Sequence, residues 1–184
     1  MKKKILSIAL LAVLFSTFHV FGQTNTIDKF ENIAVAAEKI LALTGTSTGN
    51  PQVDQFLGST SKLLQSYQSI NTKISAFNIL KNGKVSDGTN NLSKMAALAK
   101  LGGLTSQLGA LGKESSSTVS SGNTLLKGLM QQIGNKQDKN APTEDTLNKV
   151  KMAIGALSLL GTDLPASVKN AGDKMNAIKS LSGF

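Results

Sequence analysis

The feature that most constrains the fold is a long stripe of apolar residues at helical spacing. Its members are mostly three or four residues apart, as on one face of an α-helix: Val53, Phe56, Leu57, Leu63, Leu64, Tyr67, Ile70, Ile74 and Phe77. The preceding Asn50-Pro51 is typical of a helix start, and Asn82-Gly83 of a stop. The stripe therefore predicts one long helix over about residues 52–81, which would be the spine of the fold.

Shorter stripes predict further helices. They cover about residues 27–41, 92–111, 125–133, 143–161 and 163–178. Asp28 with Glu31, Thr143 with the acids that follow it, and Asp163 with Pro165 are read as helix starts. No segment alternates apolar and polar residues with a period of two, so no strand is predicted. We therefore expect an all-α fold, an irregular bundle of about six helices.

The stretch from Leu92 to Ile133 differs from the rest. It is rich in leucine, but glycines weaken its helices, and a Ser/Gly-rich stretch near 114–123 predicts a flexible break. The segments 103–109 and 128–134 resemble each other, either as a remnant of a duplication or by coincidence in a biased composition. Gly102, Gly103, Gly109 and Gly112 would either make a smooth surface for a partner or allow close packing inside the bundle.

The first 22 residues read as an export signal. Three lysines precede an apolar stretch from Ile5 to Phe21, and Val20-Phe21-Gly22 suits cleavage by a signal peptidase. The alternative is a short membrane anchor, but a span needs about 20 predominantly apolar residues. We expect residues 1–22 to be removed and residues 23–184 to form a single domain in the periplasm, or outside the cell, of a diderm bacterium. No transmembrane segment is expected in the mature chain.

The composition excludes much chemistry. The chain has no Cys and no Trp, all 20 basic residues are lysine, and its one histidine, His19, lies in the export signal. Acid–base and nucleophilic catalysis would therefore depend on 11 scattered carboxylates. No catalytic, cofactor-binding or metal-binding residue is predicted, no cofactor is expected, and the chain is not expected to be an enzyme. A carboxylate-dependent glycoside hydrolase is the enzymatic alternative.

Four short motifs contain residue types that could carry chemistry or bind a ligand. Ser59 to Lys62 matches the Ser-x-x-Lys pattern of some hydrolases, but it lies off the apolar stripe. Glu144-Asp145 is read as charge at a helix N-terminus. The segment 87–91 begins like a calcium loop, lacks its later ligands, and is read as a turn. Gly112-Lys113 lacks the remaining residues of a phosphate loop.

Two functions remain besides catalysis. The first is an exported, non-catalytic interaction protein: a periplasmic accessory subunit that docks on an outer-membrane transport complex, for example by plugging or capping a channel. The alternative is a peripheral lipid-binding or pore-forming protein that uses lysine-rich amphipathic helices. After cleavage the net charge would be +6, but the lysines are dispersed and arginine is absent, so nucleic acid is not an expected partner.

Overall fold

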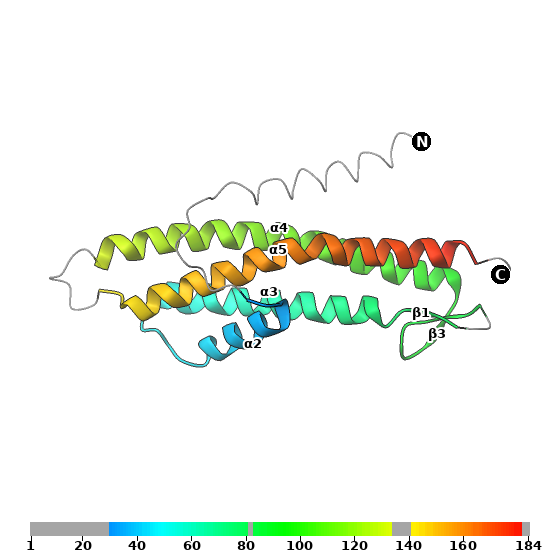
Figure 1. Ribbon diagram of the computed structural model, residues 1–184, viewed down its shortest axis with the longest axis horizontal. Coiled ribbons are helices and arrows are strands. Elements are labelled where there is room, and N and C mark those ends of the chain that lie inside the picture. Colours follow the sequence, from blue (N-terminus) through cyan, green and yellow to red (C-terminus); the bar gives the residue numbers. More distant parts are fainter. Residues whose placement is uncertain (1–29, 81–82, 134–140, 182–184) are drawn as a thin grey trace, which may run out of the picture.

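The computed structural model describes residues 30–80, 83–133 and 141–181 (Figure 1). These residues form four helices and one small sheet: α2 (Ile33–Thr44), α3 (Pro51–Ser75), β1 (Asn78–Ile79), β2 (Val85–Ser86), β3 (Asn91–Leu92), α4 (Lys94–Ile133) and α5 (Glu144–Lys179). The predicted helical character is confirmed. The prediction of about six helices is wrong for the described residues, and the prediction that no strand forms is wrong as well. Residues 1–22 lie outside the described part of the chain.

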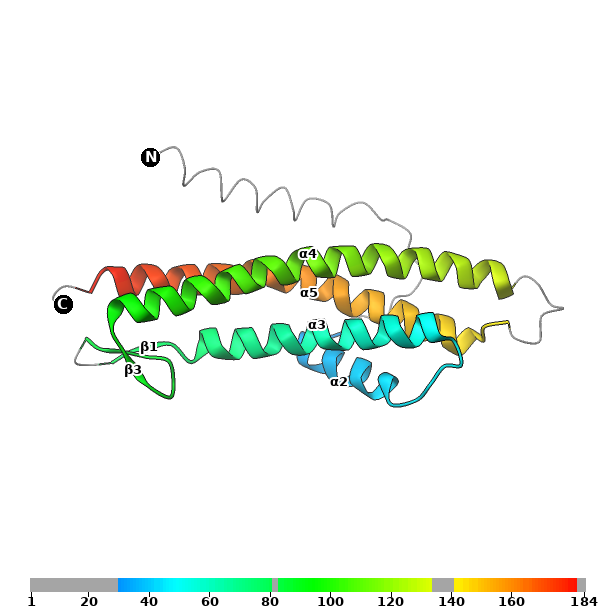
Figure 2. The same cartoon turned by 180° about the vertical axis from the view of Figure 1, so that it is seen from behind.

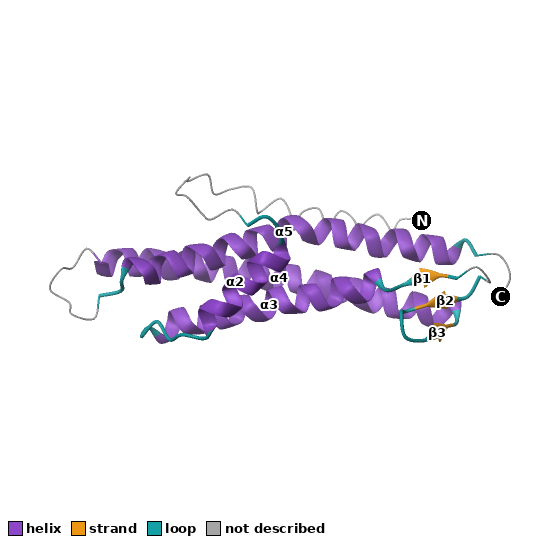
Figure 3. Cartoon of the chain, turned by 60° about the horizontal axis from the view of Figure 1, so that its bottom comes forward, coloured by secondary structure: helices purple, strands orange, loops and turns teal. Residues whose placement is uncertain are grey.

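The helices form an elongated bundle. In Figures 1 and 2, α3, α4 and α5 run lengthwise beside one another, with α4 antiparallel to the other two. The shorter α2 packs on α3 and α5. The three strands lie at one end of the bundle (Figure 3), which we call the sheet end. The opposite end, where the loop before α3 lies near the start of α5, is called the loop end.

The core is almost entirely aliphatic. Side chains that are fully buried include Ile40 of α2, Leu64 of α3, Leu101 of α4 and Leu157 of α5. Phe56, Tyr67 and Phe77 add the aromatic contribution and are 4–6% exposed. Since burial of apolar surface is the main driving force of folding, the stripe on residues 53–77 does mark the centre of the molecule, as the sequence predicts.

The spine helix is shorter than predicted. Helix α3 starts at Pro51, where Asn50 Oδ1 accepts hydrogen bonds from the amides of Gln52 at 3.0 Å and Val53 at 3.3 Å. It ends at Ser75 rather than near residue 81, which itself lies outside the described residues. Lys174 Nζ on α5 donates to the Phe77 carbonyl at 2.6 Å, and a lysine near a helix C-terminus stabilises it. Phe77 is buried as predicted, but it follows the helix.

A small sheet that the sequence did not predict follows α3. Its strands are antiparallel in the order β1-β2-β3, with Ile79 opposite Val85 and Ser86 opposite Asn91. Each strand has only two residues, too few to show alternation in the sequence. Gly88 has a φ of +90°, a backbone conformation that favours glycine. It lies in the 87–91 segment, so the prediction of a turn there is confirmed.

Helix α4 is continuous over 40 residues and is the longest described helix. The predicted break near 114–123 is therefore wrong. Ser115 and Gly122 are buried within that stretch and Leu111 and Leu129 are buried on either side of it, so packing outweighs the weak helix propensity of serine and glycine. The similar segments 103–109 and 128–134 both fall in this single helix, apart from residue 134, which lies outside the described residues.

Helix α5 also joins two predicted helices into one. It begins after Thr143, whose hydroxyl accepts a hydrogen bond from the Thr146 amide at 3.2 Å, and Glu144 and Asp145 occupy its first turn, as predicted. It does not stop at Gly161, and Pro165 lies inside it. Because Leu160 and Leu164 are fully buried, packing holds the helix together across a proline that removes one backbone hydrogen bond.

Helix α2 starts later than predicted. Asn32 Oδ1 accepts a hydrogen bond from the Val35 amide at 3.0 Å and caps the helix, so Glu31 precedes it and Asp28 lies outside the described residues. The predicted stop at Gly45 is confirmed. Within this helix Ile33, Ala37 and Ile40 are buried, as the apolar stripe predicts, whereas Leu41 is 51% exposed.

Candidate functional site

A groove of about 690 Å³ lies between α3 and α4, near the loop end. Residues from 52 to 59 of α3 form one wall, and residues from 117 to 132 of α4 form the other. These 16 residues of α4 correspond to about 24 Å of helix. The groove therefore has the length of a short peptide segment, and its α4 wall belongs to the 92–133 stretch that the sequence singled out.

The groove carries no ionisable side chain. Nine of its thirteen lining residues are uncharged and polar: Gln52, Gln55, Ser59, Ser117, Thr118, Ser120, Ser121, Thr124 and Gln132. The other four are Phe56, Leu125, Gly128 and Leu129. A surface of amides and hydroxyls over an apolar floor can hydrogen-bond and exclude water, but it offers no group for acid–base or nucleophilic chemistry.

The hydroxyl groups of α4 present mainly acceptors to the groove. Ser121 donates its proton to the Ser117 carbonyl at 3.1 Å, Thr124 to the Ser120 carbonyl at 3.1 Å, and Thr118 to the Glu114 carbonyl at 2.8 Å. A serine or threonine hydroxyl has one proton and two lone pairs. With the proton already used inside the helix, each oxygen is left to accept a hydrogen bond from a ligand.

The floor of the groove depends on a close approach of α3 and α4. A Cβ atom on Gly122 would overlap the ring of Phe56 and lie 3.0 Å from Ile154 Cγ1, so a side chain fits there only if these neighbours shift. Gly122 is therefore the glycine of α4 that makes room inside the bundle. Phe56, only 6% exposed, fills that room.

The glycines that the sequence analysis selected behave differently. A Cβ atom on Gly102, Gly103 or Gly109 would meet no other atom within 4 Å, and one on Gly112 would lie 3.5 Å from Leu164 Cδ1. Internal crowding thus does not explain the first three. They lie on α4 outside the groove, and the structure does not bring them together with its lining residues.

Ser115 is a buried polar group without a partner. Its hydroxyl is fully buried in α4 and forms no hydrogen bond. The buried hydroxyls of Tyr67 and Ser167 do have hydrogen-bond partners. Ser167 donates to Asn71 Oδ1 at 3.2 Å, and Tyr67 therefore donates to Ser167 Oγ at 2.8 Å. Burial raises the pKa of the Tyr67 phenol, with Asp163 adding to the effect and the bond to Ser167 opposing it.

The short sequence motifs have structural roles or lie on exposed helix faces. Ser59 and Lys62 are both exposed on α3. Asp87 Oδ1 accepts from the amides of Thr89 at 3.1 Å and Asn90 at 2.8 Å, while Lys100 Nζ lies 2.6 Å from Oδ2. These bonds, that to Lys100 first, lower the pKa of Asp87 and occupy both of its carboxylate oxygens.

The remaining two motifs are helical. Glu144-Asp145 opens α5, where Asp145 pairs with Lys149 at 2.9 Å. Gly112-Lys113 lies inside α4, not in a loop. Among the residues that the structure describes, no three His, Cys, Asp or Glu side chains lie close enough together to hold a metal ion.

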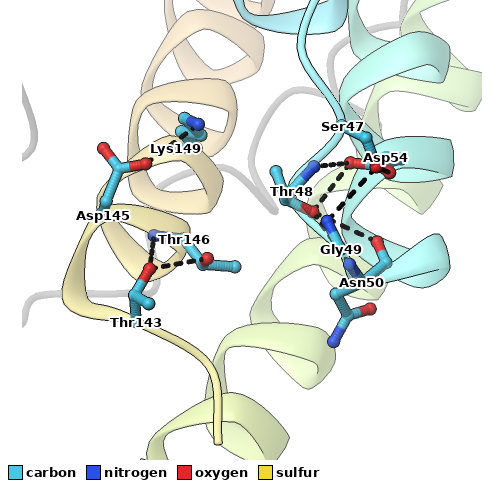
Figure 4. A network of polar contacts seen from close by, with 9 residues as sticks. All are labelled: Ser47, Thr48, Gly49, Asn50, Asp54, Thr143, Asp145, Thr146 and Lys149. Atoms are coloured by element: carbon cyan, nitrogen blue, oxygen red, sulfur yellow. Dashed lines mark hydrogen bonds and ion pairs between the residues drawn. The ribbon is translucent and has the colours of Figure 1, made fainter. Parts of the chain in front are cut away.

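A polar network fixes the loop end beside the groove (Figure 4). Asp54 on α3 accepts hydrogen bonds from the Thr48 amide at 2.8 Å, the Thr48 hydroxyl at 2.7 Å and the Ser47 hydroxyl at 2.7 Å. These bonds lower the pKa of Asp54, led by the one from the Thr48 amide. These bonds hold the loop before α3 in place. In Figure 4 the start of α5, with Asp145 and Lys149, faces this network.

The comparisons with known proteins leave the site to be interpreted from its own chemistry. Neither the family models nor the curated proteins nor the solved structures contain a match to this chain. None of the helices in the described ranges has the length and hydropathy that crossing a membrane requires.

The sequence singled out residues 92–133, which include one wall of the groove, but it did not identify the lining residues. It predicted a break from Ser115 to Gly122 and gave the role of a contact surface to glycines elsewhere on α4. The signal that could have found the lining is the spacing of Ser117, Ser121, Thr124 and Gly128, which recur every three or four residues, as one face of a helix requires.

Proposed function

We propose that this chain is an exported, non-catalytic interaction protein that binds a segment of a partner protein in the groove between α3 and α4. The observation that carries the proposal is a 690 Å³ groove without an ionisable side chain. Such a lining is suited to recognition through hydrogen bonds and apolar contact and not to catalysis.

The occupant is an uncharged segment of a different protein that presents N–H or O–H donors. A charged side chain would lose hydration in a groove that contains no opposite charge to compensate it. The α4 hydroxyls offer acceptors, so a partner rich in donors is favoured. A second copy of this chain would place the same hydroxyl acceptors opposite one another, with the amides of Gln52, Gln55 and Gln132 as the side-chain donors of the lining, which disfavours a symmetric dimer through this groove.

The biological setting is proposed from the N-terminal sequence. Residues 1–22 have the basic and apolar regions of an export signal, which supports export of the mature chain to the periplasm. There it would serve as an accessory subunit of an outer-membrane transport complex, docking on it and capping or plugging a channel. The expected mature N-terminus is Gln23, and mass spectrometry of the exported protein checks it; a mature chain that still begins at Met1 contradicts this setting.

The groove is tested by site-specific crosslinking in the bacterium followed by reconstitution. A photoreactive residue at Ser121, in the groove, should crosslink to one protein, and the same residue at Ser106 should not. Ser106 is a matched control because it is also exposed on α4 and also donates to the carbonyl four residues earlier. The crosslinked protein is then identified and purified for measurement of its affinity.

The affinity measurement decides the proposal. With the purified partner, Ser121→Lys should weaken binding at least about tenfold, since it places an uncompensated charge in the contact, and Ser106→Lys should leave the affinity unchanged. Equal affinities of the two variants, or crosslinks from Ser106 to the same protein, would show that the partner binds elsewhere or that the crosslink is incidental.

A further inference from the structure

Among the described residues, positive charge is concentrated at one end of the bundle. We define the sheet end by residues 73–100 and 169–181, which contain β1 to β3, the start of α4 and the end of α5. Its described residues carry seven lysines (Lys73, Lys84, Lys94, Lys100, Lys169, Lys174 and Lys179) and two acids, Asp87 and Asp173, a net charge of +5.

The loop end shows no such excess. Residues 44–60, 114–133 and 141–155 carry three lysines and four acids, a net charge of −1. The two ends thus differ by six charges along one elongated bundle (Figure 1). A charge separation of this kind gives the molecule a preferred orientation toward an anionic surface.

Both acids of the sheet end are already paired with lysines. Asp87 lies 2.6 Å from Lys100 and Asp173 lies 2.6 Å from Lys169. Two further lysines hold helix ends: Lys94 donates to the Lys179 and Leu181 carbonyls at 2.8 and 3.0 Å, and Lys174 donates to the Phe77 carbonyl. These bonds fix cations at the tip of the bundle, so the positive field there is part of the folded structure.

The same end exposes large apolar side chains. Met95 is 80% exposed, Ile79 is 42% exposed and Leu80 is 36% exposed. They are three of the five large hydrophobic side chains that are exposed in the described residues. Met95 follows Lys94 in the first turn of α4, and Ile79 and Leu80 lie in or beside β1. Cationic and apolar groups therefore share one tip.

We propose that the sheet end binds peripherally to a bilayer that contains anionic phospholipids. The lysines contact the headgroups, and Met95, Ile79 and Leu80 enter the boundary between headgroups and acyl chains. A bilayer offers negative charge and an apolar layer within one surface, which matches this combination. Long lysine side chains can keep their charge at the headgroups while their methylene groups lie against apolar atoms. Nucleic acid matches it less well, because the tip lacks arginine and, outside buried Phe77, aromatic side chains.

This contact is independent of the groove. The groove is lined by the first part of α3 and the last part of α4, and the tip is built from the opposite ends of both helices. A molecule that stands on a membrane by its sheet end would therefore hold the groove away from the lipid surface and leave it open to a partner protein.

Vesicle binding tests the charge. The full chain is mixed with vesicles of phosphatidylcholine alone or of equal parts phosphatidylcholine and phosphatidylglycerol, and the bound fraction is measured by flotation. We expect tighter binding to the anionic vesicles and loss of the difference in 1 M salt, where the screening length is about 3 Å. Lys2, Lys3 and Lys4 precede the apolar N-terminal stretch and are themselves attracted to anionic lipid. This stretch is shared by all variants, so the comparison among the variants assigns the contact.

Matched triple variants locate the contact. Lys73→Gln, Lys84→Gln and Lys179→Gln remove three exposed charges from the sheet end, and Lys62→Gln, Lys113→Gln and Lys127→Gln remove three exposed charges elsewhere. Each lysine near an anionic bilayer strengthens binding roughly fivefold, so the first variant should bind about one hundredfold more weakly. The second should bind like the unmodified protein. Circular dichroism melting of both verifies the fold.

A single tryptophan tests the apolar contact. Because the chain contains no Trp, Met95→Trp introduces a unique fluorophore at the tip, and Met130→Trp places one at the other end of the same helix, where the side chain is 53% exposed. Anionic vesicles should shift the emission of the first variant to shorter wavelength and leave the second unchanged.

Several results would overturn the proposal. These are no preference for anionic vesicles, equal losses in the two triple variants, an unshifted Met95→Trp emission, or binding to polyglutamate or duplex DNA as tight as to the vesicles. The last result would mean that the tip recognises a soluble polyanion and not a bilayer.

Discussion

Ser115 has a fully buried hydroxyl group that forms no hydrogen bond. Burying an unsatisfied polar group costs about 1–3 kcal/mol, and serine is a weaker helix former than alanine by a few tenths. We therefore predict that Ser115→Ala raises the free energy of unfolding by about 1 kcal/mol. Urea denaturation measures this. Ser120→Ala, on the exposed face of the same helix, is the control and should change stability by less than about 0.5 kcal/mol. A loss of stability in Ser115→Ala would mean that the hydroxyl has a partner.

Gly122 and Gly109 lie in the same helix but should respond to alanine with opposite signs. At Gly122 a methyl group would overlap the ring of Phe56, and such overpacking costs about 1–3 kcal/mol. At Gly109 it would meet no atom within 4 Å, so only the gain in helix propensity of up to about 1 kcal/mol remains. Thermal melting of both variants compares them. If Phe56 simply swings aside at no cost, Gly122→Ala will also be stabilised.

At the scale of elements, the sequence predicts helix starts well and helix continuity poorly. Asn50 and Thr143 cap α3 and α5 through bonds to nearby amides, and such local chemistry is readable from the sequence. The continuity of α4 through residues 114–123 and of α5 through Pro165 depends on which residues meet a neighbouring helix. Such contacts belong to the tertiary structure, so helix propensity alone predicts a break in both places.

The candidate site follows the same division. The sequence singled out the 92–133 stretch because it is rich in leucine although its glycines weaken the helix. The groove itself requires Gln52 and Gln55 of α3 to face Ser121 and Thr124 of α4. That pairing depends on how the two antiparallel helices pack, and no local pattern in either segment encodes it.

The end of α3 and the sheet give a prediction for adjacent residues. Phe77 is 4% exposed and Ile79 is 42% exposed. Phe77→Ala should lower the free energy of unfolding by about 3–5 kcal/mol because it leaves a cavity where β1 meets α5. Ile79→Ala should cost less than about 1 kcal/mol. Guanidinium denaturation followed by circular dichroism measures both. A melting curve of Phe77→Ala that matches that of Ile79→Ala would place the ring outside the core.

Helix α4 should be less protected toward the loop end than α3. Between Ser116 and Gly128 only Gly122 is buried, whereas α3 buries ten of its 25 residues. Low local burial lowers the free energy of local opening. Hydrogen exchange should therefore be faster in residues 116–128 than in residues 56–70, and partner binding should slow it. Equal protection of the two segments in the free protein, with no change on binding, would show that this part of α4 is core and that the interface lies elsewhere.

For the whole molecule, acid should act through carboxylates at opposite ends. Hydrogen bonds lower the pKa of Asp54 at the loop end, and the bond from Lys100 together with turn amides lowers that of Asp87 at the sheet end. In the unfolded chain both would titrate near a pKa of about 3.9. A pKa that is lower in the folded state contributes stability above the unfolded value, and that contribution is lost as pH falls toward the folded value.

Burial raises the pKa of Asp163, which works in the opposite sense: its ionised form opposes folding at neutral pH, and protonation relieves this.

The resulting pH profile can be separated into these contributions. Stability should be nearly constant from about pH 7 to pH 5 and fall below about pH 4, where the unfolded chain binds more protons than the folded one. Asp54→Asn and Asp87→Asn should each lower stability at pH 7 and flatten the decline in acid. The reason is that the substituted side chain no longer binds protons differently in the folded and unfolded states. Asp163→Asn should raise stability at pH 7 and have less effect at pH 3. Urea denaturation at each pH measures the profiles, and an unchanged acid decline in the Asp54→Asn, Asp87→Asn double variant would assign it to other carboxylates.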